Sequence, residues 1–330
     1  MSGPRPIVSV IIPSYNTRGL LAQCLASIGA GMCAGDGAPL AHETIVVDNG
    51  STDGTAAMVA LDFPAAGLIA NPGNEGYARA MNRGARYASG RFLLASNADV
   101  VYPRGSIAGM VRWLESNPRT GIAGPQLIFP SGAWQRSHQI VPGVAGAVLD
   151  LLWLTTLKNT LYGLAWKRRP PARPRAVNVG YLAGAAMLIR RDAWDRVGGF
   201  DESFFFYAED ADLCHRVKAA GYNVSFLPHI TVIHARGASS RLLGRAGAAR
   251  LQLKAKLLFV RKHRGGRRAA VYRRLVHLYA LERILFTKLC LLYLGKRCPR
   301  ALIESHEHFH ALYHASRAGM TEPEPGEGLA

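Results

Sequence analysis

Short β-branched segments alternate with segments of helical periodicity through the N-terminal third of this 330-residue chain. The segments that predict strands are residues 7–12, 44–47, 67–70 and 91–95. Between the first two, apolar side chains recur from Leu20 to Ile28 with the spacing of a helix. This alternation predicts βαβ units, and therefore an α/β fold with a mainly parallel sheet flanked by helices.

Polar side chains follow each predicted strand, at residues 13–16, 48–51, 71–76 and 97–99. Each segment taken alone has turn chemistry, because Asn and Gly tolerate positive φ and Asn can cap a helix. Ligands of parallel sheets lie beyond the carboxyl ends of the strands, so four such segments in succession favour a nucleotide site. No Gly-x-Gly-x-x-Gly follows the first strand and no Gly-x-x-x-x-Gly-Lys occurs, which argues against the common dinucleotide and P-loop sites.

Three carboxylates, Glu209, Asp210 and Asp212, lie within four positions directly after the aromatic residues 205–207. A helix is predicted to follow and to end near Gly221. Acids in a first helical turn suit the positive end of the helix dipole, so capping is one interpretation. The aromatic residues before them suggest a sheltered cleft, where a carboxylate could act as a general base.

The polar segments, in their order along the chain, resemble glycosyltransferase family 2. The motifs are residues 8–16, 46–54, 74–84 and 97–99, followed by residues 184–191, 197–202 and 207–213. The resemblance covers residues 7–240 and is nearest to bacterial rhamnosyltransferase-like members that build cell-surface glycans. It implies a GT-A fold and an inverting, metal-dependent hexosyltransferase.

The resemblance also implies which residues bind the donor, a UDP- or dTDP-sugar. Asp48 would accept a hydrogen bond from N3–H of uracil or thymine. Other residues would line or support the nucleotide-sugar, namely Pro13, Tyr15, Asn16, Asn74, Gly76, Asn82 and Asn97.

The resemblance further implies a divalent cation, Mg²⁺ or Mn²⁺, at Asp99, and a carboxylate suits this role because hard cations prefer oxygen ligands. The chain departs from the usual acidic pair at Asn97, which removes one charge from the metal. His234 would contact the metal or diphosphate, or would be a hydrogen-bonded histidine at a strand end. Arg236 and Ser239 would hold diphosphate oxygens or begin a mobile loop.

Asp210 is the catalytic base implied by the resemblance, taking the proton of the acceptor hydroxyl. Glu209 and Asp212 would lie near the acceptor or diphosphate, orient Asp210 or cap the helix. The alternative is a catalytically inactive nucleotide-sugar-binding scaffold, and the intact Glu-Asp motif argues against it.

The net charge of +18 is concentrated near the C-terminus. Residues 236–300 contain eighteen Lys and Arg but one acid, Glu282. Cations alternate with leucines there, and Glu282, Arg283 and Lys288 interrupt an apolar segment, which disfavours a membrane-spanning helix. We expect interfacial helices on an anionic membrane surface. The alternative is a basic helical hairpin packed on the catalytic domain.

These observations predict a catalytic domain at residues 1–240, with a nucleotide half to about residue 100 and an acceptor half after it. A basic helical extension at 241–312 and a flexible tail at 313–330 would follow. Residues 131–178 are read equally well as an acceptor-side element or a surface insertion. The acceptor would be a glycan or a polyprenyl-diphosphate-linked glycan.

We expect a cytoplasmic enzyme, held peripherally on the inner face of the plasma membrane. The N-terminus has no signal-peptide pattern, and five widely spaced cysteines fit a reducing compartment. Nucleic acid is not an expected partner, because no nucleic-acid-binding motif accompanies the basic charge.

Overall fold

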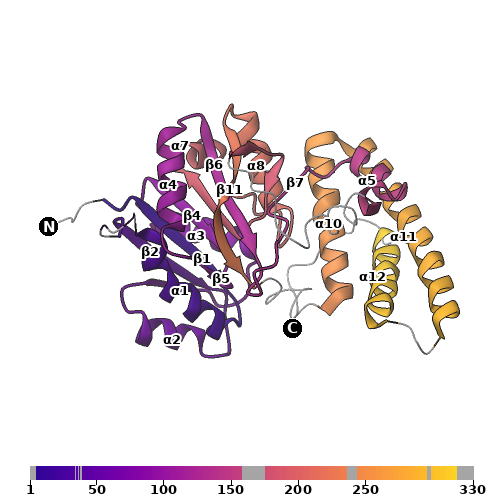
Figure 1. Ribbon diagram of the computed structural model, residues 1–330, viewed down its shortest axis with the longest axis horizontal. Helices are drawn as coiled ribbons and strands as arrows, with labels where there is room; N and C mark the ends of the chain where they lie inside the picture. The colour runs from indigo at the N-terminus through magenta and orange to yellow at the C-terminus, as the bar shows by residue number, and fades with distance from the viewer. Residues whose placement is uncertain are drawn as a thin grey trace. The chain divides into compact units, whose positions relative to one another are not determined.

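The computed structural model describes residues 5–33, 35, 37, 39–157, 175–235, 244–295 and 299–317, and it divides the chain into two compact units (Figure 1). The sheet unit comprises residues 1–141, 172–205 and 209–239. The helical unit comprises residues 142–171, 206–208 and 240–330. Residues 142–171 therefore group with the C-terminal helices, although they lie in the middle of the sequence.

The first half of the main sheet is parallel, as the alternation predicts. Strand β1 (Val8–Ser14) pairs with β2 (His42–Asp48) on one side and β4 (Phe92–Ser96) on the other, and β2 pairs with β3 (Gly67–Ala70). The predicted strand positions are confirmed to within two residues. Because these strands are parallel, the polar segments after them meet at one edge of the sheet.

The second half of the sheet is mixed. Strand β10 (Ala186–Arg190) runs antiparallel between β4 and β6 (Thr120–Ile128), and β11 (Asn223–His234) lies parallel to β6. Short strands β5 (Val100–Val101) and β8 (Val177–Asn178) pair with β11, while β7 (His138–Gln139) and β9 (Tyr181–Leu182) form a separate pair. Neighbouring β10 and β4 bring residues about 90 positions apart side by side at the site.

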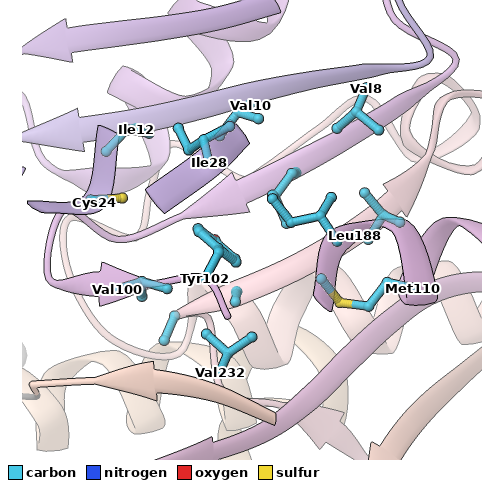
Figure 2. Packing of buried hydrophobic residues seen from close by; sticks show 14 of the residues in the cluster. Val8, Val10, Ile12, Cys24, Ile28, Val100, Tyr102, Met110, Leu188 and Val232 are labelled. Atoms are coloured by element: carbon cyan, nitrogen blue, oxygen red, sulfur yellow. The ribbon is translucent and has the colours of Figure 1, made fainter. Parts of the chain in front are cut away.

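Alternate side chains of β1 pack on opposite faces of the sheet. Val8, Val10 and Ile12 belong to a buried cluster with side chains of α1 (Arg18–Met32) and α4 (Ser106–Ser116), shown in Figure 2. On the other face, Ile11 lies against α3 (Tyr77–Tyr87), so close that a Cβ on Gly84 would be 2.5 Å from an Ile11 methyl carbon. The remaining helices of the sheet unit are α2 (Thr55–Asp62), α7 (Arg191–Val197) and α8 (Glu209–Ala219).

The helical unit contains α5 (Val144–Leu151), α10 (Gly244–Arg264), α11 (Gly266–Leu294) and α12 (Arg300–Arg317). Helix α11 packs against each of the other three. Among the residues that the structure describes, no helix combines the length and apolar character needed to cross a membrane.

Candidate active site

Asp48 is the last residue of β2, and its side chain is almost fully buried. Ser51 donates both its hydroxyl, at 2.5 Å, and its backbone N–H, at 3.1 Å, to the Asp48 carboxylate. The same hydroxyl accepts the N–H of Asn16 at 2.9 Å, and Asn16 in turn accepts the N–H of Thr52 at 2.8 Å. The turns after β1 and β2 are thus cross-linked, and they fix the carboxylate at the sheet edge.

Amide side chains continue this network along the edge. Asn71 donates to the Asn49 side chain at 2.7 Å, and Asn49 donates to the Gly76 carbonyl at 3.3 Å. The Asn74 side chain accepts the Gly76 N–H at 3.0 Å. Gly76 has φ +85° and its Cα lies so near the Phe205 carbonyl that a Cβ would be 2.6 Å from it. Glycine therefore permits the start of α3 to approach the segment that leads into α8.

The structure places three further predicted donor-binding residues, and the side chain of one of them, Asn82, is engaged within the protein. Asn82 accepts the Phe200 N–H at 2.9 Å and donates to the Phe200 carbonyl at 2.8 Å, so its side chain joins α3 to the chain before α8. Pro13 and Tyr15 are half-buried at the end of β1. A direct contact of these residues with the donor stays a prediction.

Asp99 and His234 are brought together by the pairing of β5 with β11. The Asp99 Oδ1 and His234 Nε2 atoms lie 3.2 Å apart, and both side chains are largely buried. The other ring nitrogen, Nδ1, lies 3.0 Å from Gln135 Oε1, and Gln135 Nε2 donates to the His234 carbonyl at 2.5 Å. A partner on Nδ1 fixes the ring and leaves Nε2 facing the carboxylate.

The donor set fits two neighbouring ligands of a divalent cation. Two atoms bound at right angles, at metal bonds of about 2.1 Å, lie about 3.0 Å apart, near the observed separation. Within the described residues no cluster of three or more His, Cys, Asp or Glu could hold a metal ion. A cation bound here would therefore need further oxygens, which a nucleotide diphosphate can supply.

Asp210 lies in the first turn of α8, where backbone donors hold both carboxylate oxygens. Gly184 N–H donates to Oδ2 at 2.9 Å and Ala211 N–H donates to Oδ1 at 2.7 Å. Burial raises the pKa of Asp210 to about 6, although these two hydrogen bonds oppose the shift. A carboxyl with this pKa can accept a proton near neutral pH.

Glu209 is buried beside Asp210, and its Oε2 atom has no hydrogen-bond partner among the residues that the structure describes. Burial, with the Asp210 charge adding to it, raises the pKa of Glu209 to about 8. The neighbouring Tyr77 hydroxyl donates to the Gly184 carbonyl at 3.2 Å, and burial raises its pKa well above the usual value. Both pKa values are raised, and that of Glu209 is raised further, so Asp210 is the carboxyl of the pair that loses its proton first as the pH rises.

The sheet joins the Asp99 and Asp210 regions. Asn97, two residues before Asp99, donates its N–H to the Ala185 carbonyl at 2.9 Å. Ala185 follows Gly184, which holds Asp210. Asp99 and the Gly184 N–H that holds Asp210 therefore lie at neighbouring ends of β4 and β10.

Asp212 has a structural role in this arrangement. Its side chain is fully buried, and its Oδ2 lies 2.6 Å from Arg216 Nε. Arg216 also donates to the carbonyls of Val197, at 2.7 Å, and Gly199, at 2.8 Å. The ion pair thus ties α8 to the end of α7, whereas an acceptor-binding role would need an exposed carboxylate. Arg236 and Ser239 lie outside the described residues.

We expect Asp212→Ala to destabilise the protein by about 3–5 kcal/mol, because it leaves Arg216 charged and half-buried without its partner. Urea unfolding measures this loss. Glu115→Ala, which breaks the exposed ion pair with Arg91, is the matched control and should cost less than about 1 kcal/mol. Wild-type stability of Asp212→Ala together with a raised acceptor KM would instead place Asp212 at the acceptor.

Sequence reasoning missed several residues of the site. Gln135 belongs to none of the motifs and lies in residues 131–178, for which the sequence favours no single role. It is 99 positions from His234 in the sequence. Tyr77 and Gly184 both lie in motifs that resemble the family. The sequence could not show that the Tyr77 hydroxyl contacts the Gly184 carbonyl. Ser51 and Asn49 could have been inferred from their place in the turn after β2.

Solved glycosyltransferases share this fold. The mannosyltransferase from Pyrobaculum calidifontis, solved with GDP-Man and Mn²⁺, superposes with a TM-score of 0.59 at 20% identity. The match covers 95% of this chain and 86% of that chain. At this identity the likeness concerns the fold alone, which is that of the GT-A glycosyltransferases.

The sequence matches define the family. The family model described as "Glycosyl transferase family 2" matches residues 9–198, and the N-terminal domain of galactosyltransferase matches residues 175–236. The chain belongs to glycosyltransferase family 2, as its motifs predict.

Rhamnosyltransferases are among its relatives. The N-acetylglucosaminyl-diphospho-decaprenol L-rhamnosyltransferase of Mycobacterium tuberculosis (strain ATCC 25618 / H37Rv) is 32% identical over 212 residues, covering 59% of this chain and 67% of that protein. The rhamnosyltransferase WbbL of Escherichia coli (strain K12) is 43% identical over 56 residues, covering 17% of this chain and 21% of that protein.

Proposed function

We propose that this protein is an inverting glycosyltransferase that moves a sugar from a UDP- or dTDP-sugar to a hydroxyl of a lipid-linked precursor of a cell-surface glycan. Rhamnose is the first candidate for the sugar, and a polyprenyl-diphosphate-linked glycan is the first candidate for the acceptor. The mycobacterial relative, whose name specifies both a rhamnosyl group and a decaprenol diphosphate, supports these choices.

The observation that carries the proposal is the buried Asp210, held by two backbone donors with its pKa raised to about 6. In a single displacement, the acceptor oxygen forms a bond to the anomeric carbon as the bond to the nucleoside diphosphate breaks. Asp210 accepts the hydroxyl proton in this step. A divalent cation, when held by Asp99 and His234, would supply positive charge to the departing diphosphate.

The donor assignment is tested by a screen of UDP- and dTDP-sugars with a polyprenyl-diphosphate acceptor. Mg²⁺ and Mn²⁺ are compared, and the product is detected by mass spectrometry. We expect one nucleotide sugar to give a glycosylated acceptor. Donor binding without transfer or hydrolysis, across all sugars and both cations, would favour the inactive scaffold instead.

We also propose that the enzyme works in the cytoplasm, as a peripheral protein on the inner face of the plasma membrane. A lipid-linked acceptor would be reached at that surface. The concentration of eighteen Lys and Arg in residues 236–300 supports this location, because each cation near an anionic membrane contributes about 1 kcal/mol.

We expect Asp48→Ala to weaken UDP and dTDP binding by about 10- to 100-fold, since a hydrogen bond to a charged group contributes about 1.5–3 kcal/mol. Calorimetry with UDP and N3-methylated UDP separates the cause, because the methylated base has no N3–H. Wild type should discriminate between the two ligands, and the variant should not.

Asp53→Ala is the control for the Asp48 experiment. Asp53 lies in the same turn, but its carboxylate accepts the Arg18 N–H at 2.9 Å and the Thr55 hydroxyl at 2.5 Å. The Asp53→Ala variant should therefore bind UDP in preference to N3-methylated UDP as strongly as wild type does. Unchanged UDP and dTDP affinity in Asp48→Ala would refute recognition of the base by this carboxylate.

A further inference from the structure

The exposed face of α11 changes from cationic to apolar along the helix. Its exposed charges in the first half include Arg267, Arg268 and Arg274. Further along, large apolar side chains between 39% and 90% exposed recur every three or four residues. This apolar face consists of Leu278, Leu281, Leu285, Leu289, Leu292 and Tyr293.

The opposite face of the same helix is also apolar. Tyr272, Val276, Ala280 and Ile284 are buried within the helical unit. A helix that is apolar all round is normally covered on every side. The second half of α11 is covered on one side, so its outer face lacks a partner within the residues that the structure describes.

Two of the three charges in this segment point inward. Arg283 is 3% exposed, its guanidinium carbon lies 3.1 Å from the centre of the Trp153 ring, and it donates to the Asp150 carbonyl at 3.2 Å. Glu282 accepts the Trp153 indole N–H. Lys288 remains exposed, and its long stem can carry the charge outward from an apolar surface. The outer face is thus more apolar than the sequence suggests.

Helix α5 and the residues after it extend the apolar surface. The Trp153 and Phe286 rings meet edge to face at 4.8 Å, which joins this segment to the apolar face of α11. Leu149, Leu152 and Leu154 on either side of Trp153 are also largely exposed. Several large exposed apolar side chains on segments that contact each other, as here, are typical of an interaction site.

The charge around this surface decides between a membrane and a second copy of the chain. The sequence of residues 236–300 contains eighteen Lys and Arg and one acid, Glu282, which accepts a hydrogen bond from Trp153. A second copy would bring the same excess of positive charge against it. An anionic lipid surface supplies the opposite charge together with an apolar layer beneath it.

We propose that the apolar face of α11 inserts into the acyl boundary of an anionic membrane leaflet, with Arg267, Arg268 and Arg274 among the lipid headgroups. The helix lies in the interface, since no described helix can cross the bilayer. This inference rests on the proposed function in one respect: it explains how the enzyme would meet a lipid-linked acceptor.

Flotation of the full-length protein with vesicles tests the proposal. The vesicles contain phosphatidylcholine alone or an equal mixture with phosphatidylglycerol. Wild type should float with the mixed vesicles. The triple variant Leu281→Glu/Leu285→Glu/Leu289→Glu should lose at least about tenfold in partitioning, because it places charge in the acyl boundary. Arg267→Glu/Arg268→Glu/Arg274→Glu should lose the preference for anionic lipid.

The control is Leu61→Glu, which changes a leucine 78% exposed on α2 of the sheet unit and should float like wild type. Circular dichroism checks folding, and the single variant Leu292→Glu, at the end of α11, gives a milder second readout. Equal flotation of wild type and the leucine variants would overturn the proposal. The proposal would also be overturned if wild type failed to bind vesicles but formed a dimer in sedimentation experiments, and the triple leucine variant abolished that dimer.

The test is independent of the donor and acceptor assignments, because flotation is measured without either substrate. A wrong sugar or acceptor leaves flotation unchanged. Absence of flotation together with intact transfer to a water-soluble short-chain acceptor would overturn the membrane face while leaving the transferase assignment in place.

Discussion

Replacing Asp210 by Asn should abolish sugar transfer while leaving donor binding intact. The amide keeps the size of the side chain and the hydrogen bond from Gly184 N–H, but it cannot accept the acceptor proton. General-base catalysis contributes about 10²- to 10⁴-fold, so a loss in kcat of that size is expected. Steady-state transfer assays, with calorimetric donor titration in parallel, measure the two effects separately.

Glu209→Gln is the matched control for this experiment. Burial raises the pKa of Glu209 further than that of Asp210, which favours the protonated form of Glu209, and Gln imitates that neutral form. The variant should retain most of its activity. Near-wild-type turnover of Asp210→Asn would remove Asp210 as the base, and loss in Glu209→Gln alone would transfer the role to Glu209.

The pH dependence of sugar transfer should reflect the buried carboxyl pair, Asp210 and Glu209. Asp210 works only as the carboxylate, and burial raises its pKa to about 6. Transfer by the wild-type enzyme should therefore fall as the pH decreases through about 6 and reach a plateau above it. A profile that stays flat well below pH 6 would contradict this assignment.

Replacing Asp99 by Ala, or removing divalent cations with a chelator, should each reduce turnover by about 100-fold or more. A cation held here would stabilise charge on the leaving diphosphate by several kcal/mol, and Asp99 is the carboxylate that faces His234. The measurement pairs turnover with Mn²⁺ binding, followed by electron paramagnetic resonance in the presence of UDP. His234→Ala should weaken Mn²⁺ binding as well.

Gln135→Ala separates a positioning effect from ligation in the same experiment. It removes the partner of His234 Nδ1 but no cation ligand, so it should weaken Mn²⁺ binding less than His234→Ala does. Full activity in excess chelator, with Asp99→Ala unaffected, would remove the metal assignment.

The sequence by itself determined the class of fold and most of the polar segments that gather at one edge of the sheet. Strand and helix periodicities are local properties, so residues 44–47 and 67–70 could be assigned without a structure. Asp48, Asp99 and Asp210 were selected through the resemblance to family 2, whose motifs fall at strand ends and at a helix start that the periodicities had located. The concentration of positive charge near the C-terminus was equally plain, since it depends on composition alone.

Only the tertiary structure decided which side chains meet and which way they face. Gln135 reaches His234 across 99 positions, and Arg216 buries Asp212, although the sequence groups Asp212 with the catalytic acids. Arg283 turns inward onto Trp153, which leaves the outer face of α11 apolar. Such contacts depend on how distant segments pack, and neither the period of a helix nor the spacing of a motif carries that information.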